Sequence, residues 1–154
     1  MKRRTFLKGT MASSMLGVAV SAGLLAPRAV LAAWPESSFK AKKVDDALDA
    51  LYGTVATKDS ADIKIKAPDI AENGAVVPIT ISTKLASIES ISVLIEKNPA
   101  PLACVFNLAK NTEGFVSTRV KMGKTSDLIA VVKSGGKLHT AKKTVKVKIG
   151  GCGG

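Results

Sequence analysis

The chain has 154 residues, a length that gives room for one domain. It carries 23 lysines and arginines against 12 acidic residues, while aromatic residues make up only 4%. This scarcity argues against a nucleic-acid-binding surface, which interleaves basic residues with stacking aromatics. The two cysteines and the single histidine form no cluster with metal-ligand spacing. We therefore expect neither a metal nor another cofactor.

The first 32 residues have the pattern of an export signal. Residues 3–8, RRTFLK, resemble the twin-arginine consensus, and an uncharged stretch over 9–27 leads to a signal-peptidase pattern at 30–32. That stretch lies near the lower limit of the roughly 17–25 residues that a spanning helix needs. We predict a cleaved twin-arginine signal peptide over residues 1–32, no membrane anchor, and a periplasmic protein.

Removing this signal changes the charge of the chain. Residues 1–32 hold five basic residues and no acidic one, so the remainder keeps 18 basic against 12 acidic side chains. A spread of positive charge with a lysine-rich C-terminal end fits solubility and attraction to anionic molecules or acidic partner surfaces.

The first periodic pattern after the signal is helical. After an irregular start at residue 33, apolar residues recur at spacings of three and four between Val44 and Leu51, and therefore share one helix face. Acidic side chains at positions 45 and 46 suit the first turn, and Gly53 is a suitable stop. We predict a short helix over 43–53 within an N-terminal segment that spans 33–60.

From residue 61 onward the pattern is that of strands separated by turns. Alternating apolar and polar residues predict seven strands, over 63–66, 76–82, 88–96, 102–108, 115–122, 127–133 and 140–149. Asn73-Gly74 favours a tight hairpin, and Pro78 argues that its strand is an edge strand or carries a bulge. Because strands and helices do not alternate, we predict an all-β fold, an antiparallel β-sandwich over 61–149.

The chain ends Gly150-Gly151-Cys152-Gly153-Gly154. Four glycines around one cysteine cannot form a stable strand or helix, because glycine loses the most backbone freedom on ordering. We expect residues 150–154 to be a slim, flexible arm that presents the Cys152 thiol roughly 10 Å past the last strand. A thiolate attacks sulfur and can hold a sulfur-containing group as a disulfide-like adduct. The predicted role of Cys152 is covalent attachment.

Other uses of Cys152 remain open. It could form a disulfide with Cys104, link two subunits, or carry a lipid, although a lipid anchor lacks the expected cysteine at the signal cleavage site. Cys104 alternates with Leu102, Phe106 and Leu108, so we predict that it points into the core as a small apolar residue. If Cys152 forms only a structural or dimer-linking disulfide, the protein is a secreted β-sandwich interaction module.

The sequence contains no recognisable set of catalytic residues. His139, beside a Gly-Gly turn and several lysines, is expected to be an ordinary surface residue. The carboxylates are scattered, and none lies in an acid/base motif. The glycine-rich ending lacks the strand–loop–helix context of a phosphate loop. We therefore predict a carrier and not an enzyme, with no catalytic residue.

The Gly-Gly-Cys-Gly-Gly ending resembles the signature of the SoxY family, the sulfur-carrying subunits of the periplasmic sulfur-oxidising (Sox) system. The twin-arginine signal, the Ala33-Trp34-Pro35 start and the length fit as well. The resemblance implies an immunoglobulin-like sandwich that carries intermediates of thiosulfate oxidation on Cys152, with the four terminal glycines as its arm.

The same resemblance implies three protein partners. One is a SoxZ-like β-subunit that lacks its own export signal and would be exported with this chain as a heterodimer. A c-type cytochrome would load thiosulfate onto the thiol. A separate hydrolase would then release the terminal sulfonate as sulfate, and the remaining sulfur would stay on the cysteine.

Overall fold

The computed structural model describes residues 35–148. Two helices, α2 (Glu36–Lys40) and α3 (Val44–Tyr52), precede the strands. The strands are β1 (Thr57–Asp59), β2 (Ile63–Lys66), β3 (Ile70–Ala71), β4 (Val77–Thr83), β5 (Ile88–Ile95), β6 (Leu102–Asn107), β7 (Phe115–Val120), β8 (Ser126–Ser134) and β9 (Lys137–Val147). The signal peptide predicted for residues 1–32 and the arm predicted for 150–154 lie outside the described residues.

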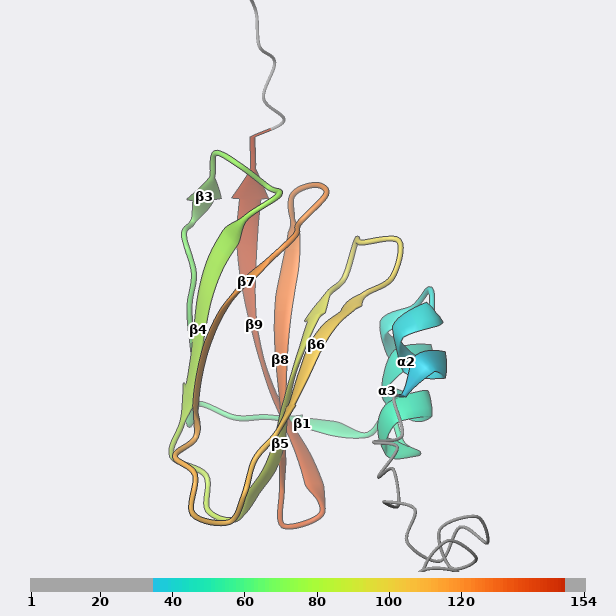
Figure 1. Ribbon diagram of the computed structural model, residues 1–154, viewed down its shortest axis with the longest axis vertical. Helices are drawn as coiled ribbons and strands as arrows, with labels where there is room; N and C mark the ends of the chain where they lie inside the picture. The colour runs from blue at the N-terminus through green and yellow to red at the C-terminus, as the bar shows by residue number, and fades with distance from the viewer. Residues whose placement is uncertain (1–34, 149–154) are drawn as a thin grey trace, which may run out of the picture. The chain divides into compact units, whose positions relative to one another are not determined.

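The strands form two sheets (Figure 1). The larger has the order β1-β9-β8-β5-β6, with β3 also paired to β9, and the smaller has the order β2-β4-β7. All seven predicted strands are present, and the predicted all-β sandwich with a short N-terminal helix is confirmed. The expectation of purely antiparallel pairing is wrong for β1 and β3, which pair with β9 in parallel. These strands of three and two residues are too short to show an alternating pattern.

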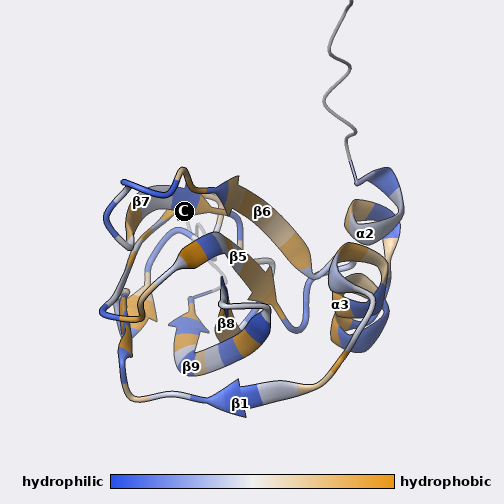
Figure 2. Cartoon of the chain, turned by 90° about the horizontal axis from the view of Figure 1, so that it is seen from below, coloured by the Kyte–Doolittle hydropathy of each residue, from blue (hydrophilic) through white to orange (hydrophobic). Residues whose placement is uncertain are grey.

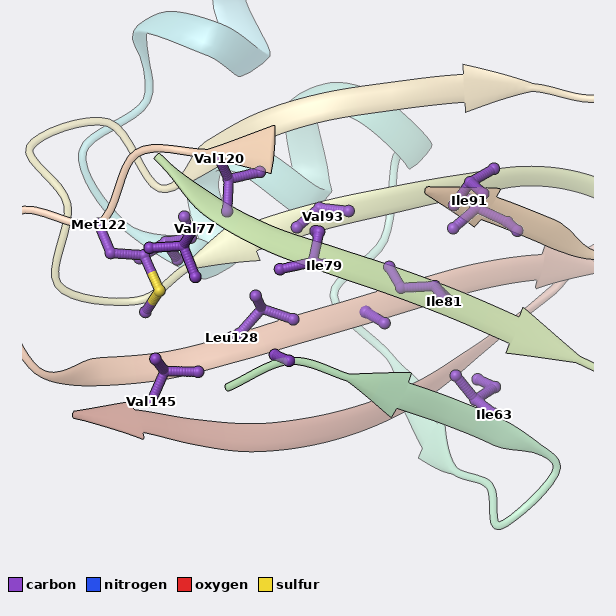
Figure 3. Packing of buried hydrophobic residues seen from close by; sticks show 14 of the residues in the cluster. Ile63, Val77, Ile79, Ile81, Ile91, Val93, Val120, Met122, Leu128 and Val145 are labelled. Carbon is purple, nitrogen blue, oxygen red and sulfur yellow. The ribbon is translucent and has the colours of Figure 1, made fainter. Parts of the chain in front are cut away.

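A core of aliphatic side chains fills the space between the sheets (Figure 3). The smaller sheet contributes Ile79 and Ile81, and the larger contributes Ile91, Val93 and residues of β8 and β9. Burying one such side chain stabilises the fold by roughly 1.5–3 kcal/mol. The alternating sequence of these strands places their apolar side chains between the sheets, and the burial of those side chains is the main force that holds the sheets together.

The helices form a third layer on the outer face of the larger sheet (Figure 2). Ala47 and Leu48 of α3 pack with Leu94, Ile129 and other apolar residues of that sheet in a second buried cluster. The predicted helix is confirmed, and it ends at Gly53 as expected. The irregular start predicted after residue 33 is wrong over α2, a single turn too short to produce a helical period.

Tyr52 fixes α3 to the sheet through its hydroxyl group. That oxygen is hydrogen-bonded to the hydroxyls of Ser90, at 3.1 Å, and Ser92. Both serines lie on β5 and are buried. The hydroxyl of Tyr52 therefore satisfies two polar groups that water cannot reach.

Two local expectations fail where the chain passes between the sheets. Pro78 lies in the central strand β4, not in an edge strand, and this position is tolerated because β2 pairs only with Thr80–Thr83. The Asn73-Gly74 turn forms no hairpin, since β3 pairs with β9 while β4 pairs with β2 and β7. The turn instead carries the chain from one sheet to the other.

We predict that Tyr52→Phe lowers the free energy of unfolding by about 1–3 kcal/mol, because it leaves buried serine hydroxyls without their partner. Urea denaturation measures this change. In a protein that already carries Ser90→Ala and Ser92→Ala, Tyr52→Phe should lower the free energy of unfolding by a much smaller amount. Equal losses in the two backgrounds would contradict the account.

Candidate functional site

The candidate site begins where β9 ends. Cys152 and the four arm glycines lie outside the described residues, so the structure shows the base from which they follow and not the residues themselves. That base is the end of the sandwich where β9 runs past β3 (Figure 1).

Backbone hydrogen bonds to the β3 segment hold the chain through Lys148. The amide of Lys146 donates to the carbonyl oxygen of Asp69 at 2.9 Å, and the amide of Lys148 donates to that of Ala71 at 3.0 Å. Each further bond fixes one more residue of β9, so the chain has a defined direction when it leaves the sheet.

A side chain holds the opposite edge of this segment. The amide of Val147 donates to Oγ1 of Thr125 at 3.0 Å, just beyond the last pairing of β9 with β8 at Val145–Ser126. A weaker contact is the exposed ion pair between Lys148 and Glu72, at 3.6 Å. The end of β9 is therefore held from both sides.

Gly74 lies where two loops and β9 come together. Its carbonyl oxygen accepts a 2.7 Å hydrogen bond from the amide of Met122. A Cβ atom at Gly74 would stand 2.4 Å from the carbonyl oxygen of Met122 and 2.7 Å from Cγ1 of Val147. Only glycine fits this space, so Gly74 is required by close packing and not by a hairpin.

Asn98 joins two further loops at the same end. Its Nδ2 donates to the carbonyl oxygen of Lys121 at 2.8 Å, and its Oδ1 accepts from the amide of Gly123 at 3.0 Å. This bidentate contact holds the β5–β6 and β7–β8 loops side by side. Neither this contact nor the role of Thr125 was predicted from the sequence.

Cys104 is a free, half-buried cysteine in the edge strand β6. It packs against the main core as predicted, and burial raises the pKa of its thiol to about 11. The predicted alternation is broken, however, by a bulge opposite Val93 and Leu94, so Leu102 packs in the cluster beneath the helices. Since the nucleophile is the thiolate, Cys104 is poorly suited to covalent chemistry near neutral pH.

The strand register places Cys104 far from the end of β9. Cys104 pairs with Val93, which pairs with Ala130, which in turn pairs with Ala141. With the usual spacings between strands and between residues, Cys104 lies about 14 Å from Val147 across the sheet and about 20 Å from it along the strands. Five residues span at most about 17 Å. An intramolecular disulfide with Cys152 would require the end of β9 to detach.

The remaining sequence candidates do not form a site. His139 is half-buried in β9, between its register partners Lys58 and Val132, and is therefore less exposed than predicted. Over residues 35–148, the structure places no three His, Cys, Asp or Glu side chains together where they could hold a metal ion. In the same range, no helix is long and apolar enough to cross a membrane.

Comparison with known families identifies the chain. The model of the family described as "Sulfur oxidation protein SoxY" matches residues 48–152. The chain belongs to the SoxY family. A similar solved structure is that of the sulfur carrier protein SoxY from Chlorobium limicola f thiosulfatophilum, with 42% sequence identity and a TM-score of 0.64. The match covers 70% of this chain and 97% of the other. Membership supports a sulfur-oxidation carrier role.

A second solved structure shows the fold alone. The superoxide reductase (neelaredoxin) from Ignicoccus hospitalis matches with a TM-score of 0.50 and 20% identity, over 56% of this chain and 80% of that one. A search of curated protein sequences finds no match.

We predict that Gly74→Ala lowers the free energy of unfolding by about 1–3 kcal/mol, because its Cβ meets backbone and a packed valine. Gly123→Ala is the matched control, since its Cβ would meet only Oδ1 of Asn98, at 3.7 Å. That control should change stability by less than about 0.5 kcal/mol. Urea denaturation measures both variants, and an equal loss would contradict the assigned packing.

We also predict that Cys104 is slow to alkylate in the folded protein. In a Cys152→Ser variant at pH 8, iodoacetamide should react roughly 100-fold more slowly than after unfolding in urea, because burial favours the neutral thiol and leaves little thiolate. The folded-state rate should rise as the pH approaches the raised pKa. Equal folded and unfolded rates at pH 8 would contradict this assignment.

Proposed function

We propose that this chain carries intermediates of thiosulfate oxidation as covalent adducts of the Cys152 thiol and presents them to partner enzymes. The observation that carries the proposal is the extent of the family match, which runs from residue 48 through Cys152 itself. The similar structure from Chlorobium limicola is described as a sulfur carrier protein, which supports the same role.

The described base fits a tethered carrier. Hydrogen bonds hold the chain through Lys148, and Cys152 follows four residues later. A tether of that length reaches at most about 14 Å from the sandwich. The glycines at 150, 151, 153 and 154 form the arm in this proposal, since they add little bulk and restrict the backbone least. Cys104, by contrast, is half-buried and its pKa is raised.

The chemistry divides into two steps. In loading, the Cys152 thiolate and the outer sulfur of thiosulfate form an S–S bond, and two electrons pass to the c-type cytochrome partner. The product is a thiol-bound thiosulfonate. In the second step, a hydrolase adds water across the bond between sulfur and the sulfonate, which releases sulfate and two protons and leaves a persulfide anion on Cys152.

In this division of work the chain supplies the attachment point and its partners supply catalysis. A SoxZ-like β-subunit would form the heterodimer, and the cytochrome and hydrolase would act on the arm in turn. The twin-arginine pattern of residues 3–8 supports export to the periplasm. A signal-less β-subunit could then be exported together with this folded chain.

The alternative role, a secreted module with a structural cysteine, is weaker. The register distance disfavours a Cys104–Cys152 disulfide within one folded chain. A disulfide between two copies through Cys152 is distinguished by the experiment that follows.

We predict reducible sulfur adducts on Cys152. The protein is purified from periplasm without reductant, and trypsin cleavage after Lys148 releases a six-residue peptide, 149–154, that contains Cys152. Its mass should show added sulfur, sulfite or thiosulfate that a reductant removes. Cys152→Ser should lose these adducts, whereas Cys104→Ser should retain them.

The opposite outcome is equally specific. If the peptide appears only as a disulfide with another copy, or with the Cys104 peptide, even after thiosulfate and the cytochrome are supplied, the carrier role is wrong. The protein would then be a structural secreted domain.

A further inference from the structure

Four segments meet at the end of the sandwich from which the arm follows. They are the β3–β4 turn (72–76), the β5–β6 loop (96–101), the β7–β8 loop (121–125) and the end of β9 (146–148). The hydrogen bonds of Met122 with Gly74, Asn98 with Lys121, and Val147 with Thr125 show that they are in contact. Figure 1 shows the strands that lead into them reaching one end of the fold.

These segments are strongly cationic. They contain five lysines and two glutamates. Lys148 pairs with Glu72, but the other lysine side chains are exposed and have no ion pair among the described residues. We call these four residues the lysine rim: Lys97, Lys121, Lys124 and Lys146.

The opposite end of the sandwich has a much smaller excess. Its connecting segments, 60–62, 84–87, 108–114 and 135–136, together with the start of β9 (137–139), contain three lysines and two acidic residues. The lysines are Lys84, Lys110 and Lys137, and all three are exposed. The charge of the lysine rim is therefore a local feature and not a consequence of a uniformly basic surface.

Apolar side chains lie beside the lysine rim. Ile70 and Val76 are each 50% exposed, and Ile70 is the register partner of Lys146. A site for a small anion requires donors that converge on one point, whereas these lysines are spread over separate segments. Spread charges beside exposed aliphatic groups instead fit a transient contact with a protein surface of opposite charge, where electrostatic complementarity guides the encounter.

We propose that the lysine rim docks onto an acidic protein surface around the active-site entrance of the enzymes that act on Cys152. This inference rests on the proposed function of Cys152. Because the lysine rim lies at the end of the sandwich where β9 ends, contact there would bring the partner's active site close to the residues that follow Lys148. Exposed ion pairs are individually weak and screened by salt, which suits a carrier that must leave each enzyme after reaction.

The test compares two double variants with the same net charge. Lys124→Glu with Lys146→Glu changes the lysine rim, and Lys84→Glu with Lys110→Glu is the control at the opposite end. The measurement is kcat/KM for formation of the Cys152 thiosulfonate by the thiosulfate-loading cytochrome purified from the same periplasm, at a series of NaCl concentrations.

We expect the rim variant to lose at least about 10-fold in kcat/KM at low salt, and this gap to shrink as salt screens the charges. The control should change by less than about 2-fold. Alkylation of Cys152 by neutral iodoacetamide should be unchanged in both variants, which verifies an intact thiol. Equal values for the two variants would overturn the docking role and leave the carrier function standing.

A small anionic reagent separates docking from simple attraction of anions. The reaction of Cys152 with the anionic disulfide 5,5′-dithiobis(2-nitrobenzoate) should fall by less than about 3-fold in the rim variant. A fall equal to that of the enzymatic rate would show that the lysine rim attracts small anions, and would overturn protein docking. Absence of any adduct in the unmodified chain would overturn both the proposed function and this inference.

Discussion

The architecture depends on the way β9 is held along its whole length. It pairs with β8 from Lys137 to Val145, with β1 near its start and with β3 at its end. Its Lys143 extends to the β2–β3 connection, where its ammonium group lies 2.7 Å from the carbonyl oxygen of Ala67 and 3.0 Å from Asp69. These contacts join the edges of the two sheets. They also fix the backbone through Lys148, the point from which the predicted cysteine-bearing arm follows.

Periodicity predicted most of this fold, because burial on one face imposes a regular pattern. The strand over Ile63–Lys66 was predicted with its observed bounds, and the helix was predicted to within a residue of Val44–Tyr52. Short elements were missed, since β1 and β3 form by pairing with β9 and need no pattern of their own. Pro78 shows the same limit: whether proline is tolerated depends on where β2 stops, which is a property of the partner strand.

The candidate site, like the fold, could be predicted from the sequence only in part. Attachment at Cys152 stays a prediction. It was drawn from local composition, because four glycines around one cysteine disfavour a regular structure, and Cys152 lies outside the described residues. The base could not be predicted, since Gly74, Asn98 and Thr125 act through residues 22 to 73 positions away in the chain. The lysine rim is likewise a product of topology. Its members lie on three separate segments that only the folded sandwich brings to one end.

The central claim is that Cys152 retains one sulfur of thiosulfate while the sulfonate leaves. Supplying the complex and its partner enzymes with thiosulfate isotopically labelled at either sulfur tests it most directly. The account predicts that label in the outer sulfur remains on peptide 149–154 and is released by a reductant, whereas label in the sulfonate sulfur is recovered as sulfate. Label from both positions in free products, with none on that peptide at any time during turnover, would contradict a covalent carrier.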